Sequence, residues 1–371
     1  MKNVLITNYV DILAPKVKVF SKSKRYVATG DVIKNKIISF SEFTFDSKPS
    51  RANIQAINGD ILIAKMKDTN KVLLINKDNE NNMYSTGFAL FRIKDKNFID
   101  PKYLYFWFLS NDFQTFKNKN SSGATQKAIR DQELKKSKIP FVSLAQQKKI
   151  VSILEKAEKL KEKRKEANKL TEEYLNSIFN EIYYNKNFEE IKLSDNKYFH
   201  IIMGQSPKGN SYNHVGEGTP FFQGKKEFRD KYPTVEQWTT KPSKMAQSND
   251  ILISVRAPVG ATNLSNIDCC IGRGLAAIRC KKGIETDFVY SFLKVKKKEI
   301  ENLGNGSTFK AITSKQLLDI KIPIPPNSSQ KKFTEIVEKV EKIKENQKQS
   351  DKELNNLFNS LMQKAFRGEL I

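Results

Sequence analysis

A stretch of 40 residues occurs twice in this chain. Residues 123–162 and residues 306–345 align without a gap at an offset of 183, and 19 of the 40 positions are identical. Unrelated sequences share far fewer residues, so the stretch is an internal duplication. The offset is close to half of the 371 residues, which predicts two tandem units of related architecture.

The residues that precede each copy predict a domain of mixed α and β structure. Residues 59–64 form a short run rich in β-branched side chains, as is typical of a strand. A helix is expected from Asp100, because a proline follows it directly and aromatic residues recur on one face. The same order returns in the second half, where residues 249–254 correspond to residues 59–64. A shared scaffold with diverged loops is typical of related domains that bind different ligands.

Each copy of the repeat continues into a long helical segment. Residues 145–185 contain neither proline nor glycine, so this helix has room for about 40 residues, or roughly 60 Å. Apolar residues recur at heptad spacing, and the polar residues Arg164 and Gln347 occupy equivalent positions, where they would set the register. The expected seam residues are Ile150, Ile153, Ala157, Leu160, Ala167, Tyr174 and Ile178 in the first helix, and Phe333, Ile336, Val340, Ile343, Leu354, Leu357 and Leu361 in the second.

Two helices in one chain that is built head to tail are most simply paired in antiparallel orientation. The predicted fold class is therefore α+β, with two mixed α/β domains separated by an antiparallel coiled coil. The domains are expected at residues 1–144 and 188–327, and the helices at residues 145–187 and 328–371. Two separate helices that each dimerise with another molecule are the alternative.

The charge of the chain points to a polyanionic partner. The sequence has 65 basic and 41 acidic residues, which gives a net charge of +24. Nucleic acid and an anionic membrane surface both fit this charge. The alternative is a lysine bias of the genome, which would need no polyanionic partner. Since no apolar stretch reaches membrane-spanning length and the N-terminus lacks a signal peptide, we expect a cytoplasmic protein without a membrane partner. Three cysteines and two histidines fit no disulfide framework and no metal site.

Both copies of the repeat begin with the pattern Gly-[Ala/Ser]-Thr-x-Lys-Ala-Ile. A glycine, a hydroxyl group and a lysine at a turn before a helical segment suit contact with a phosphate group. An ordinary helix N-cap with a solvated lysine is the alternative. The candidate residues are Gly123, Thr125 and Lys127 in the first copy, and Gly306, Ser307, Thr308 and Lys310 in the second.

Further candidates for DNA contact lie mainly in the second domain. A polar loop offers amide, hydroxyl and ammonium donors on a flexible backbone, from Gly204, Gln205, Ser206 and Lys208. Arg256 and Arg273 lie beside glycines just past strand ends, where they could reach guanine edges or phosphates. The matching region of the first domain carries Lys65 instead. Plain turns with a surface charge are the alternative for each.

Catalytic motifs are missing from the sequence. The loop at residues 204–210 has the spacing of a phosphate-binding P-loop, but Asn210 stands where the lysine is needed. An Asn-Pro-Pro-Tyr-like tetrapeptide of amino-methyltransferases is also missing. We therefore expect no enzyme that acts alone, such as a free-standing nuclease or methylase.

Four features together resemble the specificity subunit of type I restriction–modification systems. They are the repeated Gly-[Ala/Ser]-Thr-x-Lys-Ala-Ile turn, the Lys-Ile-Pro hinge that leads through Gln-Lys-Lys into each long helix, the Gly204-Gln-Ser-Pro loop, and the terminal Ala-Phe-Arg-Gly-Glu-Leu of residues 365–370. The first domain departs from the pattern, because it lacks the Gly-x-Ser-Pro loop.

The resemblance implies two target-recognition domains, each reading half of a bipartite, asymmetric site on double-stranded DNA, with the helices as spacer. It also implies two docked methyltransferase subunits and leaves open whether restriction subunits join them. S-adenosylmethionine, ATP and Mg²⁺ would be bound by those partners, and no cofactor by this chain. The rival hypothesis is a coiled-coil assembly protein whose basic surface binds RNA or membrane without sequence preference.

Overall fold

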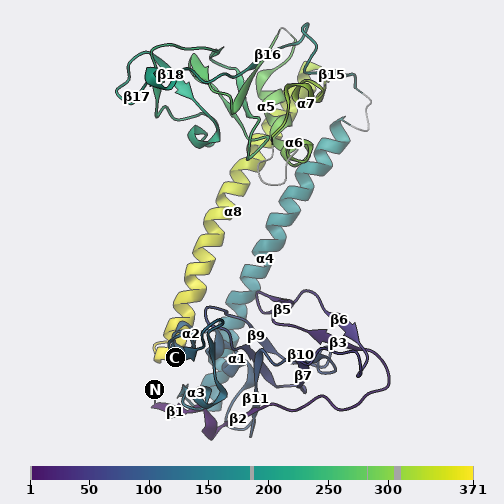
Figure 1. Ribbon diagram of the computed structural model, residues 1–371, viewed down its shortest axis with the longest axis vertical. Helices are drawn as coiled ribbons and strands as arrows, with labels where there is room; N and C mark the ends of the chain where they lie inside the picture. The colour runs from purple at the N-terminus through teal and green to yellow at the C-terminus, as the bar shows by residue number, and fades with distance from the viewer. Residues whose placement is uncertain (1, 184–187, 282, 305–310, 371) are drawn as a thin grey trace. The chain divides into compact units, whose positions relative to one another are not determined.

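The computed structural model describes residues 2–183, 188–281, 283–304 and 311–370. The chain divides into two compact units, Met1–Lys165 with Gln349–Ile371 (unit 1) and Glu166–Lys348 (unit 2). Each unit contains one globular domain and about half of each long helix, α4 (Leu144–Tyr183) and α8 (Asn327–Arg367) (Figure 1).

In unit 1 the globular domain has two four-stranded sheets among its described residues. One sheet is antiparallel, and helix α1 (Pro101–Leu109) packs on it, because Tyr103 and Leu104 share a buried cluster with Ile61 and Phe91. In strand order, the sheets consist of β2 (Val10–Leu13), β11 (Phe88–Ile93), β8 (Ile61–Ala64) and β9 (Val72–Leu74), and of β6 (Ser41–Phe43), β3 (Lys24–Val27), β10 (Met83–Ser85) and β7 (Ala52–Gln55).

Short strand pairs and helices complete this domain. Residues 32–37 form a hairpin, in whose turn Lys34 and Asn35 adopt positive φ angles of 48° and 61°. The remaining elements are β1 (Lys2–Leu5), which pairs with β14 (Lys138–Phe141), β4 (Val32–Ile33) with β5 (Lys36–Ile37), β12 (Ser121–Ser122) with β13 (Ala128–Ile129), and the helices η1 (Ile6–Asn8), α1 (Pro101–Leu109), α2 (Asn111–Lys119) and α3 (Asp131–Leu134).

Unit 2 repeats this plan with different loops. Its antiparallel sheet contains β16 (Phe199–Met203), β24 (Leu275–Cys280), β21 (Ile251–Ser254) and β22 (Thr262–Leu264), and its mixed sheet contains β17 (Tyr212–Asn213), β19 (Trp238–Thr239), β18 (Thr219–Phe222), β23 (Cys269–Ile271) and β20 (Met245–Ala246). The other described elements are β15 (Glu190–Lys192), paired with β25 (Lys321–Pro323), and the helices η2 (Gly209–Ser211), η3 (Lys225–Glu227), α5 (Thr286–Val295), α6 (Lys297–Leu303) and α7 (Ser314–Leu318).

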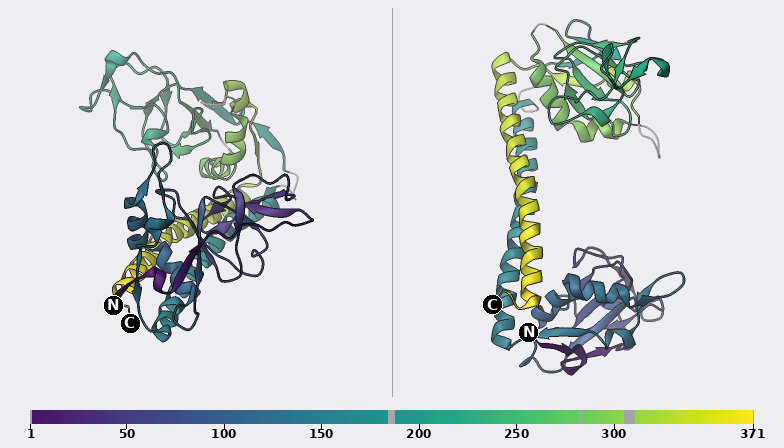
Figure 2. Two further views of the ribbon diagram at one scale, coloured as in Figure 1. Left: turned by 60° about the horizontal axis from the view of Figure 1, so that its bottom comes forward. Right: turned by 90° about the vertical axis from the view of Figure 1, so that its left-hand side faces the viewer.

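The long helices pair in antiparallel orientation, as the sequence predicts. In unit 1 the start of α4 packs on the end of α8, since Leu154 and Phe366 belong to one buried cluster. In unit 2 the end of α4 packs on the start of α8, where Phe179 and Phe333 have ring centroids 5.9 Å apart. Figures 1 and 2 show the teal α4 beside the yellow α8 within each unit.

Four residues assigned to the seam lie outside it, which corrects the sequence analysis. Leu160, Tyr174, Ile343 and Leu357 are 50%, 57%, 47% and 47% exposed. The contacts between the helices include polar residues instead: the ammonium of Lys161 lies over the Phe358 ring, 4.5 Å from its centroid. Gln347 is buried as predicted, and its Nε2 donates to Thr171 Oγ1 at 2.8 Å. Arg164, at the equivalent position of α4, differs from Gln347, because its buried Nε has no hydrogen-bond partner among the described residues.

A buried glutamine fastens each globular domain to the start of a long helix. In unit 1, Gln147 Nε2 donates to the carbonyl groups of Phe98 (2.8 Å) and Val142 (2.9 Å), and its Oε1 accepts from the Asp100 N–H (2.9 Å). In unit 2, Gln330 accepts from the Glu285 N–H (3.0 Å) and donates to the Pro325 carbonyl (2.9 Å). The two glutamines are equivalent in the repeat, at the offset of 183.

Candidate nucleic-acid interface

Three strands of the mixed sheet in unit 2 have their carboxyl-terminal ends on the same side, along the edge formed by the strand ends. Strand β18 pairs in parallel with β23, while β17 and β18 both pair in antiparallel orientation with β19, so β17, β18 and β23 run in the same direction. The loops that follow them, residues 214–218, 223–227 and 272–274, therefore lie along one edge, which we call the loop edge. The Gly272 N–H donates to the Phe222 carbonyl (2.8 Å), which joins two of these loops directly.

The predicted Gly204 loop joins the loop edge. The Gln205 N–H donates to the Ile271 carbonyl (3.0 Å), and the Arg273 N–H donates to Ser206 Oγ (3.3 Å). Gly204 itself passes so close to the neighbouring backbone that a Cβ would lie 2.2 Å from the Gly272 carbonyl oxygen. Only glycine fits this approach. The structure thus brings Gly204, Gln205 and Ser206 together with Arg273.

Arg256 lies next to this group, and Lys208 lies further along the loop. The Val255 N–H donates to the Gly274 carbonyl (3.0 Å), which places Arg256 beside the end of the loop edge. Arg256 also forms a β-bridge with Ala311. The exposed Lys208 precedes η2, where its carbonyl accepts from Ser211. The predicted residues Gly306, Ser307, Thr308 and Lys310 fall outside the described residues.

Unit 1 has the same backbone arrangement with other side chains. The Lys65 N–H donates to the Gly87 carbonyl (2.9 Å), as Val255 does to Gly274 in unit 2. Met66 forms a β-bridge with Ala128, as Arg256 does with Ala311. The structural counterpart of Arg256 is therefore Met66, one residue past the predicted Lys65. The Lys65 ammonium lies 3.4 Å from the Asp131 carboxylate, so it is already partly paired.

The Gly123 turn joins this region of unit 1. The Lys67 N–H donates to the Lys127 carbonyl (2.9 Å), so the turn is attached to the loop that follows β8. Gly123, Thr125 and Lys127 are all exposed. Their contact with phosphate stays a prediction, and the geometry leaves their polar groups accessible to a ligand.

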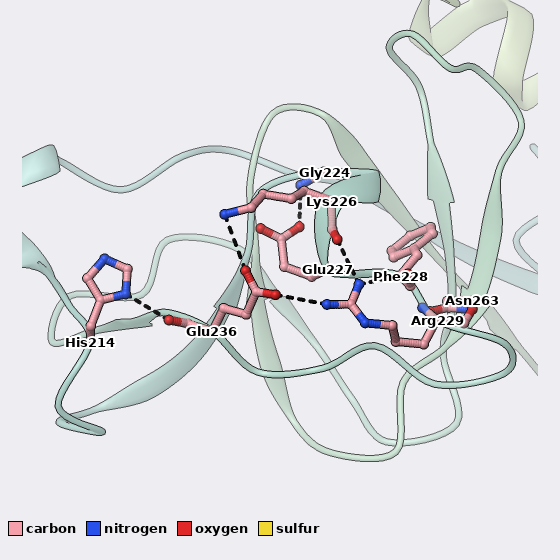
Figure 3. Close-up of polar contacts among 8 residues, drawn as sticks. All are labelled: His214, Gly224, Lys226, Glu227, Phe228, Arg229, Glu236 and Asn263. Atoms are coloured by element: carbon pink, nitrogen blue, oxygen red, sulfur yellow. Dashed lines mark hydrogen bonds and ion pairs between the residues drawn. The ribbon is translucent and has the colours of Figure 1, made fainter.

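Cations gather at the loop edge of unit 2. Arg256, Arg273 and Lys225 are exposed, and none of them forms an ion pair within the described part of the chain. Lys226 and Arg229 are held by Glu236, whose carboxylate lies 3.2 Å and 2.8 Å from them (Figure 3). The hydrogen bond from Lys226 holds the pKa of the Glu236 carboxyl below its usual range. Unpaired, exposed cations suit binding to phosphate and to guanine edges.

In the described ranges, no group of three His, Cys, Asp or Glu side chains is arranged to hold a metal ion. Among the helices of the described residues, none is long and apolar enough to cross a membrane.

Sequence analysis alone missed several residues of the loop edge. Lys225, Lys226 and Val215 reach it because β17 and β18 end there, and the sequence around them carries no motif. A glycine beside a strand end was the usable signal at Gly204 and Arg273.

Comparisons with known proteins agree with this geometry. The model of the type I restriction modification DNA specificity domain matches residues 16–172 and 185–356. A putative type I restriction enzyme specificity subunit, MjaX of Methanocaldococcus jannaschii, is 34% identical over 346 residues, which cover 86% of this chain and 80% of that protein.

Solved structures extend the similarity over the whole chain. A chain from a study of complex assembly and conformational transition of the type I R-M system matches with a TM-score of 0.72 and 31% identity, covering 100% of this chain and 98% of that one. The HsdS subunit from Thermoanaerobacter tengcongensis matches with a TM-score of 0.51 and 29% identity, covering 97% of each chain. Because both repeats match the family model, this chain belongs to the type I restriction–modification DNA specificity family and is a DNA-recognition subunit rather than a catalytic one.

Proposed function

We propose that the two domains read two different half-sites of one asymmetric DNA sequence. The observation that carries this proposal is the repeated backbone with different side chains at equivalent positions, Arg256 in unit 2 and Met66 in unit 1. A guanidinium donates hydrogen bonds to guanine or phosphate, whereas a thioether makes apolar contacts, so the two domains would prefer different bases. The Gly204–Ser206 loop, which the first domain lacks, adds to the difference.

A domain exchange tests the half-site assignment. Residues 190–305 are replaced by the corresponding segment of a related specificity subunit, and the chain is expressed with its methyltransferase. Genome-wide mapping of methylated adenine should then show a change in one half of the site only. A change in both halves would contradict the modular assignment. DNA binding should also weaken with salt, by about 0.9 in log–log slope for each phosphate that is neutralised.

We further propose that two methyltransferase subunits dock on the paired helices. The exposed apolar residues of the helices support this, because they are related by the repeat: Leu160 corresponds to Ile343, and Tyr174 to Leu357, at the offset of 183. Unit 1 contains Leu160 and Leu357, and unit 2 contains Tyr174 and Ile343, so each unit presents one such pair. Two equivalent apolar sites suit two copies of one partner.

Substitutions in these sites test the docking. Tyr174→Asp and Leu160→Asp should each reduce the complex from two bound methyltransferase subunits to one, and the double variant should bind neither. Multi-angle light scattering gives the stoichiometry. Asn180→Asp, at an exposed position of the same helix, serves as the matched control and should leave two subunits bound. Full occupancy of the double variant would refute the docking site.

The methyltransferase and restriction subunits would carry out the catalytic reactions. We propose that they bind S-adenosylmethionine, ATP and Mg²⁺, that restriction subunits can join the complex, and that it works in the cytoplasm. The family resemblance supports this division of labour, and equilibrium dialysis of the purified chain should detect none of the three ligands. The rival hypothesis, an assembly protein that binds RNA or membrane without sequence preference, is not supported, because the family match includes both domains.

A further inference from the structure

Val215 is an apolar side chain presented to solvent at the loop edge of unit 2. It is 86% exposed, and its neighbours along the chain are His214, Gly216 and Glu217. Single exposed apolar residues are common on protein surfaces and by themselves mean little. What distinguishes Val215 is the way its loop is held.

The Val215 loop is fixed by hydrogen bonds that do not use the valine side chain. Asn213 Oδ1 accepts from the N–H groups of Val215 (3.2 Å) and Glu217 (3.0 Å), and Asn213 Nδ2 donates to the Glu217 carbonyl (2.8 Å). His214 Nδ1 lies 2.8 Å from the Glu236 carbonyl oxygen (Figure 3). A loop that is ordered before binding loses little conformational entropy when its tip contacts a ligand.

The end of the loop is equally constrained. Gly218 has a φ of +86°, and a Cβ there would lie 2.4 Å from the Thr239 carbonyl oxygen. The loop therefore returns tightly to strand β18, while the Val215 side chain within it stays open to solvent. Its conformation is set by Asn213 at one side and Gly218 at the other.

Cations lie on the neighbouring loops of the same sheet edge. Strand β17 ends at Asn213, level with Pro220 of β18, since both pair with Trp238 of β19. The next loops along the edge carry Lys226 and Arg273. Glu236 connects the two sides, because its carbonyl contacts His214 while its carboxylate holds Lys226 and Arg229 (Figure 3). Phosphate contacts by the unpaired Lys225 and Arg273 would bring the Val215 loop against base edges.

We propose that Val215 reads a thymine, by packing against the C5-methyl group in the major groove. Base edges in the grooves are polar apart from this methyl group, which is the apolar partner that duplex DNA offers to a valine. The contact would supply one base preference in the half-site that unit 2 reads. This inference rests on the proposed function, because it needs a sequence-specific half-site to act on.

Replacement of thymine by uracil tests the contact, since it removes only the methyl group. The complete chain is bound with its methyltransferase to duplexes of the methylated site, and uracil replaces each thymine of the unit 2 half-site in turn. At one position, uracil should weaken binding by the wild type about fourfold, the factor expected for one buried methyl group. Val215→Ala should weaken binding to the thymine duplex by a similar factor and should no longer respond to uracil at that position.

Two controls make the result specific. Glu217→Gln, in the same loop, should keep the full response to uracil. Asn213→Ala should weaken binding to both duplexes, because it releases the loop that presents the valine. Circular dichroism of Val215→Ala should match that of the wild type, since the side chain is exposed.

The possible failures are distinguishable. If the wild type shows no preferred site at all, the proposed function fails. If the wild type has a preferred site but no thymine of the half-site responds to uracil, or if Val215→Ala keeps the full response, the assignment of Val215 is overturned while the proposed function stands.

Discussion

Removal of the buried glutamine that fastens a domain to its helix should destabilise that unit strongly. In Gln147→Ala, the Asp100 N–H and the carbonyl groups of Phe98 and Val142 lose their partner. Each buried polar group left without a partner costs about 1–3 kcal/mol, and water that enters the space left by the side chain offsets part of that cost. We therefore expect a loss of about 3 kcal/mol in the free energy of unfolding of unit 1. Gln330→Ala should cause a similar loss in unit 2.

The two tryptophans allow each unit to be followed separately. The sequence contains two, Trp107 in unit 1 and Trp238 in unit 2. In the Trp238→Phe background, fluorescence during urea unfolding reports on unit 1, and in the Trp107→Phe background it reports on unit 2. With a urea dependence of about 2 kcal/mol per molar, a loss of about 3 kcal/mol lowers the midpoint by about 1.5 M.

The pattern of shifts decides the test. Gln147→Ala should shift mainly the unit 1 signal, and Gln330→Ala mainly the unit 2 signal. Gln147→Glu keeps the size of the side chain but turns a carboxylate oxygen toward two carbonyl groups, so it should destabilise at least as much as alanine. A midpoint shift below about 0.5 M in either alanine variant would refute the role assigned to these glutamines.

Three further predictions concern single residues. Asp250→Ala leaves the Arg279 guanidinium without its two hydrogen bonds of 2.8 Å, and should cost unit 2 about 3 kcal/mol in urea unfolding; a loss below about 1 kcal/mol would contradict this. Burial lowers the pKa of Lys117 from 10.5 to about 8, so the unfolded chain holds this proton to higher pH. The stability of unit 1 should therefore rise between about pH 8 and 10.5, by at most about 3 kcal/mol, relative to Lys117→Met; parallel pH profiles would refute it. Gly204→Ala should cost unit 2 about 2 kcal/mol or more, whereas Gly209→Ala, where a Cβ meets nothing within 4 Å, should be near neutral; equal urea midpoints would exclude the close approach.

The heptad pattern predicted the helices and their pairing but misplaced part of the seam. The helices carry apolar residues on more than one stripe, and the middle of the true seam is polar, as Lys161 and Gln347 show. A heptad assignment based on apolar residues alone therefore places the exposed Leu160 and Tyr174 in the seam by mistake. Which stripe faces the other helix depends on packing along the full pair, and the sequence of one helix does not contain that information.

At the candidate site, residues with unusual backbone needs were predictable and ordinary residues were not. Gly204 and Arg273 stood out because glycines flank strand ends, and the structure joins them. Arg256 was recognised by the same signal, but its counterpart in unit 1 is Met66 rather than Lys65. The alignment of residues 249–254 with residues 59–64 already places Met66 opposite Arg256, and Lys65 is the basic residue next to that position.

The sequence by itself determined that the protein is a duplication, that each half carries a mixed α/β domain, and that two long helices connect them. These properties follow from repeated residues and local periodicity, which are visible along the chain. Only the tertiary structure decided that the loops after Asn213, Phe222 and Ile271 share one sheet edge, and hence that Val215 lies on the same edge as Lys225 and Arg273. That edge arises from the pairing of strands far apart in sequence, and such pairing is set by the packing of the whole domain rather than by the residues of any one strand.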